Sequence, residues 1–178
     1  MKTLLFLRHA KSDWYQTGDD GEAVADIERP LSNRGLKAGR LIRDFLKERS
    51  FNIDCVEYST ARRAKMTFDL IKPSLESILS METQELYTFN YQCLLKKISK
   101  TQNTISNLMI IGHNPAFQEA ITFLANPKLE KVAYNLIERK YPTGALAVLK
   151  LNIIDWKDLS RSCGYLYEFL TPSELKRQ

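Results

Sequence analysis

Short apolar runs alternate with longer amphipathic stretches along this chain. The apolar runs stop abruptly at arginine, glycine or serine, which is typical of strands buried on both faces of a sheet. The pattern predicts strands at 3–7, 53–59, 81–85, 108–111, 145–153 and 164–170. Apolar residues at helical spacing, with capping and turn residues at the ends, predict helices that begin at Ser32, near Thr60, near Tyr91 and at Pro115.

The alternation of strands with helices predicts an α/β fold. Helices of ten or more residues between strands are typical of parallel connections, and no repeat or linker interrupts the pattern. We therefore expect residues 1–178 to form a single three-layer domain, with a mainly parallel central sheet flanked by helices. In such sheets, ligands bind at the carboxyl ends of the strands.

Composition and charge narrow the range of partners. With 44% hydrophobic and 26% charged residues, the chain has the composition of a soluble globular protein. Its net charge of +5 favours a phosphorylated or otherwise acidic partner, while the lack of basic clusters interleaved with aromatics argues against nucleic acid. Three widely spaced cysteines and an opening apolar run that ends at Arg8 predict a cytoplasmic protein without disulfides, zinc, signal peptide or membrane association.

Basic side chains follow three of the predicted strands. The chain has only two histidines, and both His9 and His113 come within two residues of the end of an apolar run. The strand that ends at Ser59 leads into a helix whose first turn carries Arg62 and Arg63. Because the carboxyl ends of parallel strands meet at one edge of the sheet, we expect these groups to converge on one polar pocket.

Two other interpretations of the histidines have to be weighed. A single histidine after a strand is usually a hydrogen-bonded or surface residue, but here both histidines and an arginine pair occupy strand ends. Two histidines are also a candidate metal site. Neighbouring arginines oppose a bound cation, whereas their guanidinium groups match phosphate oxygens. We therefore expect no metal and no cofactor, and a pocket for an anionic substrate.

Several motifs resemble the histidine phosphatase superfamily and its short branch, the SixA-type phosphohistidine phosphatases. The opening LRHAKSDW resembles that branch's form of the R-H-G signature, with Ala10 in place of the glycine. Four further stretches resemble the family in the same order along the chain, namely 26–35, 59–67, 112–115 and 142–149. The resemblance implies a phosphoglycerate mutase-like fold without a large cap.

The resemblance also implies roles for individual residues. His9 is similar to the nucleophile that becomes phosphorylated, and Arg8 to a phosphate ligand beside it. Alignment of the S-x-A-x-R-A-x-x-T motif places Arg63 in the pocket and makes Arg62 an outward neighbour. His113 resembles the second pocket histidine, which hydrogen-bonds the transferring phosphoryl group.

Other residues near these motifs are weaker candidates. Ser12 and Asn114 lie in the flanking loops and are candidates for substrate binding. The aromatics Tyr87, Phe89 and Tyr91 are candidates for a rim of the pocket, although we favour core packing for them.

The catalytic acid of larger relatives has no obvious counterpart here. Those relatives carry it in an insertion between the arginine and second histidine motifs, and in this chain the corresponding segment, 64–112, is short. The candidates for a general acid are Glu82 and Glu85 in this segment and Asp20 and Asp26 in the loop after the first strand. Of these we favour Asp26 or Glu85. The simplest role for each is a solvated surface charge.

The missing acid favours one substrate class. An alkoxide leaving group needs a proton, whereas a phosphorylated imidazole that is protonated on its other nitrogen departs as neutral imidazole, whose conjugate acid has a pKa near ~6.5. We therefore expect a phosphatase that forms a covalent phosphohistidine and removes phosphate from phosphohistidine on proteins, such as those of the histidine phosphotransfer type. The alternatives are a phosphomonoesterase for a small phosphorylated metabolite, a non-catalytic phosphoprotein-binding module and, more remotely, a mutase.

Overall fold

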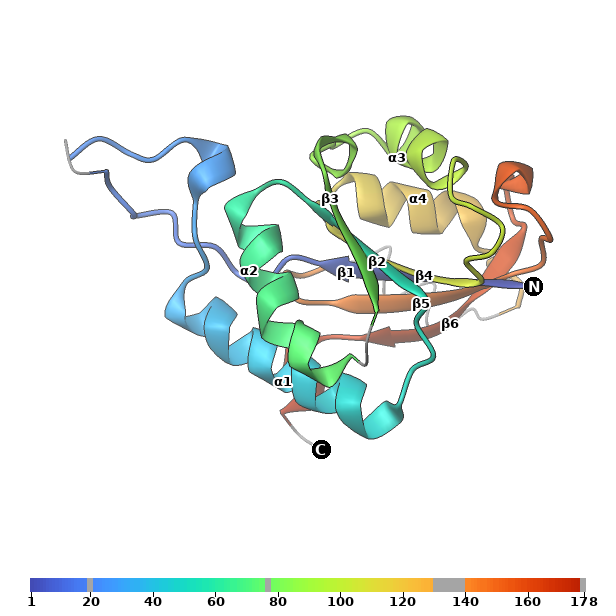
Figure 1. The fold of residues 1–178 in the computed structure, drawn as a ribbon, viewed down its shortest axis with the longest axis horizontal. Helices are drawn as coiled ribbons and strands as arrows, with labels where there is room; N and C mark the ends of the chain where they lie inside the picture. The colour runs from blue at the N-terminus through green and yellow to red at the C-terminus, as the bar shows by residue number, and fades with distance from the viewer. Residues whose placement is uncertain (19–20, 76–77, 130–139, 177–178) are drawn as a thin grey trace.

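Six strands form one sheet in the order β3-β2-β4-β1-β5-β6 in the computed structural model (Figure 1). The structure describes residues 1–18, 21–75, 78–129 and 140–176 of the 178-residue chain. The strands are β1 (Lys2–Arg8), β2 (Cys55–Ser59), β3 (Leu79–Thr83), β4 (Asn107–Gly112), β5 (Leu146–Leu151) and β6 (Gly164–Leu170). The α-helices described are α1 (Asn33–Arg49), α2 (Arg62–Ile71), α3 (Tyr91–Ile98), α4 (Ala116–Leu124) and α6 (Pro172–Leu175).

The sheet is mainly parallel, as the sequence predicts. Among the described strands, β1 pairs in parallel with β4, β4 with β2, and β2 with β3, whereas β5 and β6 add antiparallel pairings at the other side of β1. The parallel block β2-β4-β1 brings the carboxyl ends of three strands together at one edge. This edge carries the basic residues singled out above.

Helices cover both faces of the sheet and make three layers. α1 and α2 lie on one face, and α3 and α4 lie on the other (Figure 1). Side chains of each strand alternate between the two, so that Leu5 and Leu7 of β1 belong to the core under α1 and α2, whereas Leu4 and Phe6 belong to the core under α3 and α4. The predicted α/β fold is confirmed.

Most predicted elements agree with the described ones to within a few residues. Ser32 caps α1 as predicted, because its hydroxyl accepts a hydrogen bond from the Gly35 amide at 3.2 Å. The edge strand β3 begins and ends two residues before the predicted 81–85. It ends at Thr83 because the Thr83 hydroxyl accepts a hydrogen bond from the Glu85 amide and starts a 3₁₀ turn.

Membrane-spanning segments were also sought in this part of the chain. Among the described residues, no helix combines the length and the apolar character that a bilayer crossing requires.

Candidate active site

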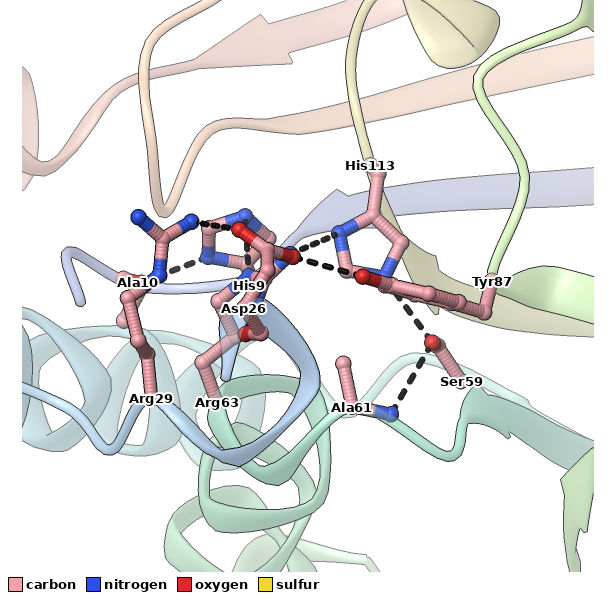
Figure 2. Close-up of polar contacts among 9 residues, drawn as sticks. All are labelled: His9, Ala10, Asp26, Arg29, Ser59, Ala61, Arg63, Tyr87 and His113. Carbon is pink, nitrogen blue, oxygen red and sulfur yellow. Dashed lines mark hydrogen bonds and ion pairs between the residues drawn. The ribbon is translucent and has the colours of Figure 1, made fainter. Parts of the chain in front are cut away.

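Three strand ends bring the predicted basic residues together. Arg8 is the last residue of β1 and pairs in register with Gly112, the last residue of β4, so the histidines that follow both strands are neighbours. The ring centroids of His9 and His113 lie 5.1 Å apart. Arg63, in the first turn of α2 after β2, contacts both rings, as Figure 2 shows. The predicted convergence is present.

These groups line one pocket at the carboxyl edge of the sheet. Its volume is about 590 Å³, and its lining is dominated by cationic side chains. Asp26 is the only acidic residue among the described residues that line it. The basic residues of the lining are Arg8, Lys11, Arg29, Arg34, Arg63 and Lys140, besides His9 and His113.

His9 is buried and has distinct partners on its two ring nitrogens. Its Nδ1 lies 2.8 Å from the carbonyl oxygen of Ala10, and its Nε2 accepts a hydrogen bond from Arg63 Nε at 3.3 Å (Figure 2). A proton on Nδ1 and a lone pair on Nε2 satisfy both contacts. Burial, together with His113, Arg63 and Arg8, holds the pKa of His9 well below its usual value. His9 is therefore a neutral imidazole that turns Nε2 toward Arg63.

Arg63 connects the two histidines with the segment that precedes α1. Its side chain donates to the Asp26 carbonyl at 2.5 Å and to the Asp26 carboxylate at 2.9 Å, and its NH2 group lies 3.4 Å from Nδ1 of His113. Thr67, one turn later on α2, donates to the Arg63 carbonyl and accepts from the Ala10 amide. This bridge fixes α2 against the residue that follows His9.

The adjacent arginine points elsewhere. Arg62 is exposed and does not line the pocket, whereas Arg63 is only 3% exposed. The alignment that placed Arg63 in the pocket and Arg62 outside it therefore agrees with the structure.

His113 is held by groups that sequence reasoning did not single out. Its Nε2 lies 2.8 Å from the hydroxyl of Ser59, a buried residue whose oxygen also accepts from the Ala61 amide at 3.2 Å. Burial, then Arg63 and Arg8, lower the pKa of His113 to about 3. A neutral His113 can accept from Arg63 at Nδ1 and donate from Nε2 to Ser59.

Two aromatic residues lie against His113. The rings of Tyr87 and Phe89 are centred 5.3 Å and 5.7 Å from the His113 ring. Phe89 lines the pocket and is 49% exposed. The expectation of core packing is therefore wrong for Phe89, which lines the pocket, and for Tyr87, which lies against His113 and Asp26. Tyr91 packs against the core under α3 and α4.

Asp26 neutralises part of the positive charge. It lies in the short 3₁₀ turn Asp26–Glu28 and accepts hydrogen bonds from Arg63, Arg29 and, at 2.6 Å, the Tyr87 hydroxyl. Burial opposes its ionisation, but the hydrogen bonds from Tyr87 and Arg63 hold the pKa of Asp26 below its usual value. Its carboxyl group is therefore ionised at neutral pH.

The other acidic candidates do not reach the pocket or are not described. Glu85 is exposed, does not line the pocket, and forms an ion pair with Lys100 at 2.7 Å. The Lys100 hydrogen bond lowers the pKa of Glu85. Glu82 lies 3.4 Å from Lys65, and Asp20 lies outside the described residues. The structure thus brings Asp26 to the histidines and leaves Glu85 away from them.

Arg8, Ser12 and Asn114 complete the predicted lining. Arg8 donates to the Tyr141 carbonyl at 2.5 Å, while its buried Nε has no hydrogen-bond partner within the described part of the chain. Ser12 is buried at the wall of the pocket, and Asn114 donates to the Gln118 side chain at 3.0 Å. All three line the pocket beside the histidines.

Residues 4–92 match the model of the histidine phosphatase superfamily, branch 1. The chain belongs to this superfamily. A solved structure from Nakamurella multipartitia, provisionally assigned as the phosphohistidine phosphatase SixA, is 25% identical, with a TM-score of 0.79 and 96% of each chain covered. The predicted superfamily, its SixA-type branch and the phosphatase class are confirmed.

Two more distant structures share the fold. The protein histidine phosphatase SixA complexed with tungstate is 19% identical, with a TM-score of 0.74 over 97% of this chain and 99% of that one. Phosphoserine phosphatase from Entamoeba histolytica, in complex with 3-phosphoglyceric acid, is 13% identical, with a TM-score of 0.63 over 98% and 100% of the chains. The fold is therefore shared by phosphatases of proteins and of small metabolites.

In the ranges that the structure describes, no three His, Cys, Asp or Glu side chains gather as a group that could hold a metal ion.

Proposed function

We propose that this phosphatase removes phosphate from phosphohistidine on proteins through a covalent phospho-His9 intermediate. The observation that carries the proposal is the state of His9. The ring is neutral, its Nδ1 proton is held by the Ala10 carbonyl, and its Nε2 lone pair, which accepts a hydrogen bond from Arg63, lies in a pocket whose other ionisable groups are mainly cationic. A nucleophile of this kind suits attack on an anionic phosphoryl group.

The first step transfers the phosphoryl group to His9. Nε2 attacks phosphorus in line and a new N–P bond forms, while the P–N bond of the substrate breaks. The substrate ring is protonated on its other nitrogen, so the substrate histidine takes the bonding pair and leaves as neutral imidazole. The cationic phospho-His9 keeps its Nδ1 proton, which the Ala10 carbonyl accepts. Arg8, Arg63 and His113 are placed to donate to the phosphoryl oxygens, where negative charge accumulates in the transition state.

The second step returns His9 to its starting state. Water attacks phosphorus, the bond to Nε2 breaks, and phosphate leaves with the proton of the water redistributed to the phosphate and solvent. Arg8 lines the pocket, and its buried Nε has no hydrogen-bond partner among the described residues. Arg63 exchanges its contact with His9 for contacts with the phosphoryl group in each cycle.

The protonation of the pocket supports phosphohistidine over phosphate esters. An ester releases an alkoxide and needs a general acid, but Asp26 accepts from three donors and is ionised, which makes it a poor acid. Glu85 forms an ion pair with Lys100 outside the pocket. The imidazole of a ring-protonated phosphohistidine leaves without such an acid, which makes a phosphomonoesterase the less favoured candidate.

A non-catalytic phosphoprotein binder is also less favoured. Recognition of a phosphoryl group needs the guanidinium groups, but it does not need a buried neutral histidine with an unprotonated ring nitrogen in the pocket. The proposed partner is therefore a substrate protein of the histidine phosphotransfer type. A reducing cytoplasmic setting is part of the same proposal, and the three free cysteines support it.

The test combines trapping with a substrate panel. Rapid acid-free quenching of wild-type protein with a ³²P-phosphohistidine protein should leave acid-labile label on the enzyme, and His9→Ala should carry none. Values of kcat/KM for the phosphohistidine protein should exceed those for a panel of phosphate monoesters. Label on His9→Ala would contradict the covalent mechanism, and much larger kcat/KM for the esters would assign the enzyme to metabolites.

A further inference from the structure

Large aromatic side chains are exposed where the chain leaves the pocket. Trp14 lines the pocket and is 67% exposed, and Tyr15 beside it is 93% exposed. Both belong to the segment between β1 and α1, which projects from the body of the molecule (Figure 1). Single exposed aromatics are ordinary, but a pair at the mouth of a pocket is typical of surfaces that bind another protein.

One lysine and one arginine of the pocket lining lie apart from the groups that contact His9. Lys11 and Arg34 are exposed and line the pocket mouth, and neither has an ion-pair partner among the described residues. Arg29 differs from them, because Asp26 neutralises it and its guanidinium stacks on the Trp14 ring at 3.5 Å. Lys11 and Arg34 are therefore the charges left for a second anionic group.

The backbone holds Lys11 and Arg34 in one place. The Lys11 carbonyl accepts hydrogen bonds from the Ser32 amide at 2.9 Å and from the Ser32 hydroxyl at 3.0 Å. A side chain on Gly35 would meet the same carbonyl oxygen at 2.1 Å, so the glycine permits this close approach. The loop after β1 is thus fixed to the first turn of α1, which sets the backbone positions of Lys11 and Arg34 relative to His9.

We infer that Lys11, Arg34, Trp14 and Tyr15 form a docking surface for a phosphorylated protein that carries acidic side chains around its phosphohistidine. This inference rests on the proposed function. A protein fits the surface better than a small metabolite does, because Tyr15 projects outside the pocket lining and only an extended partner can contact it while its phosphoryl group reaches His9. Acidic side chains of the partner complement Lys11 and Arg34.

The test compares a phosphohistidine protein with a small molecule that carries the same phosphoryl group. The substrates are a histidine phosphotransfer domain phosphorylated on its histidine, and free phosphohistidine. The readout is the ratio of their kcat/KM values. Lys11→Glu/Arg34→Glu should lower this ratio about tenfold or more at low ionic strength, and added salt should shrink the effect because it screens exposed charges.

Matched variants separate docking from general charge and folding effects. Lys37→Glu/Arg40→Glu makes the same charge change at exposed positions of α1 outside the pocket lining, and it should leave the ratio unchanged. Tyr15→Ala should lower the ratio about threefold to tenfold, as for an interface aromatic of moderate importance. Tyr167→Ala, which removes a 53% exposed tyrosine of β6, should not lower it.

Each contrary result has a distinct meaning. A ratio unchanged by both Lys11→Glu/Arg34→Glu and Tyr15→Ala overturns the docking surface, as does an equal loss on both substrates, which places the defect in the pocket. If wild-type protein hydrolyses free phosphohistidine without preferring the protein, docking fails while the phosphohistidine phosphatase stands. If it hydrolyses neither substrate but does hydrolyse monoesters, the proposed function fails and the docking surface fails with it.

Discussion

The Lys97–Glu57 ion pair and the histidine–arginine pocket are both built around strands of the same sheet, and they differ in how their charge is balanced. Lys97 of α3 and Glu57 of β2 form an ion pair at 2.5 Å, with side chains only 7% and 6% exposed. Neither lines the pocket at the carboxyl edge. Their opposite charges cancel within the fold, as a permanently buried pair requires.

The pocket at the end of the sheet is balanced only in part. Two guanidinium groups, from Arg8 and Arg63, lie with two neutral imidazoles, and the only acidic side chain of the described lining is Asp26, which is 44% exposed. Asp26 comes from the projecting segment rather than from the sheet. The comparison shows that the Lys97–Glu57 pair leaves no net charge in the core, whereas the excess of positive charge at the pocket suits an anion.

Breaking the closed pair should have the largest effect. Lys97→Met leaves the Glu57 carboxylate buried without its partner, which should lower the free energy of unfolding by about 3–5 kcal/mol. Lys97→Met/Glu57→Leu removes both charges and should recover most of that loss. Urea unfolding measures both variants. A double variant as unstable as the single one would show that the loss arises from packing and not from the unpaired charge.

Breaking the pocket group should affect catalysis rather than the fold. Arg63→Ala removes the donor to His9 and one of two guanidinium groups, and should lower kcat/KM for a phosphohistidine protein by about 10²–10³-fold. Arg62→Ala changes the adjacent exposed arginine and should stay within about twofold of wild type, as for an exposed side chain away from the site. Similar losses in the two variants would contradict the assignment of Arg63 to the pocket.

The sequence was most informative about the floor of this pocket. Arg8, His9, Arg63 and His113 follow strands whose apolar runs are clear, and parallel pairing alone brings such strand ends together. The start of α1 was equally predictable, because a serine before a helical apolar pattern is a common N-cap, and the cap depends only on neighbouring residues.

The contacts that support the pocket residues could not be predicted from the sequence pattern. Ser59 acts through a distant partner, His113, and the Tyr87 hydroxyl acts through Asp26, so no local spacing indicates either contact. Strand parity offers one signal for Ser59, which shares its face of β2 with Cys55 and Glu57. The choice between Asp26 and Glu85 depends on where two loops lie in space, which periodicity does not report.

The pH dependence of stability should distinguish the pocket from the rest of the core. The pKa of His113 is about 3 in the folded protein, below its value in the unfolded chain, so the unfolded state binds more protons between those values. The contribution of His113 to the free energy of unfolding is fully present above about pH 6.5 and is lost as the pH falls toward about 3. From pH 7 to pH 5 this histidine should account for about 2 kcal/mol of lost unfolding free energy.

Unfolding in urea at both pH values checks the sign and the source. His113→Asn lacks the titrating ring, so it should lose about 2 kcal/mol less than wild type over the same interval. Arg63, Arg8 and Asp26 face the ring in wild type and remain in the variant, so their contributions are common to both proteins. An equal loss in the two proteins would show that His113 is not held neutral.

The smallest expected effect concerns the hydroxyl that holds His113. In the free pocket Arg63 donates to Nδ1, which leaves the proton on Nε2 for donation to Ser59. When Nδ1 donates to a phosphoryl oxygen, Nε2 must accept, and the Ser59 hydroxyl can then donate to it. Ser59→Ala removes this partner and should lower kcat about tenfold, the value of one net hydrogen bond, with little change in KM.

A control and a spectroscopic readout separate this role from simple packing. Ser80→Ala, at an exposed position of β3, should leave kcat unchanged. Nitrogen-15 shifts of the His113 ring should report a proton on Nε2 in the free wild-type protein and on Nδ1 when phosphate is bound. If Ser59→Ala makes the same change of tautomer and keeps its kcat, then Arg63 alone controls His113. The pocket would then differ from the Lys97–Glu57 pair in its net charge alone, and the Ser59 hydroxyl would have no part in the change of tautomer.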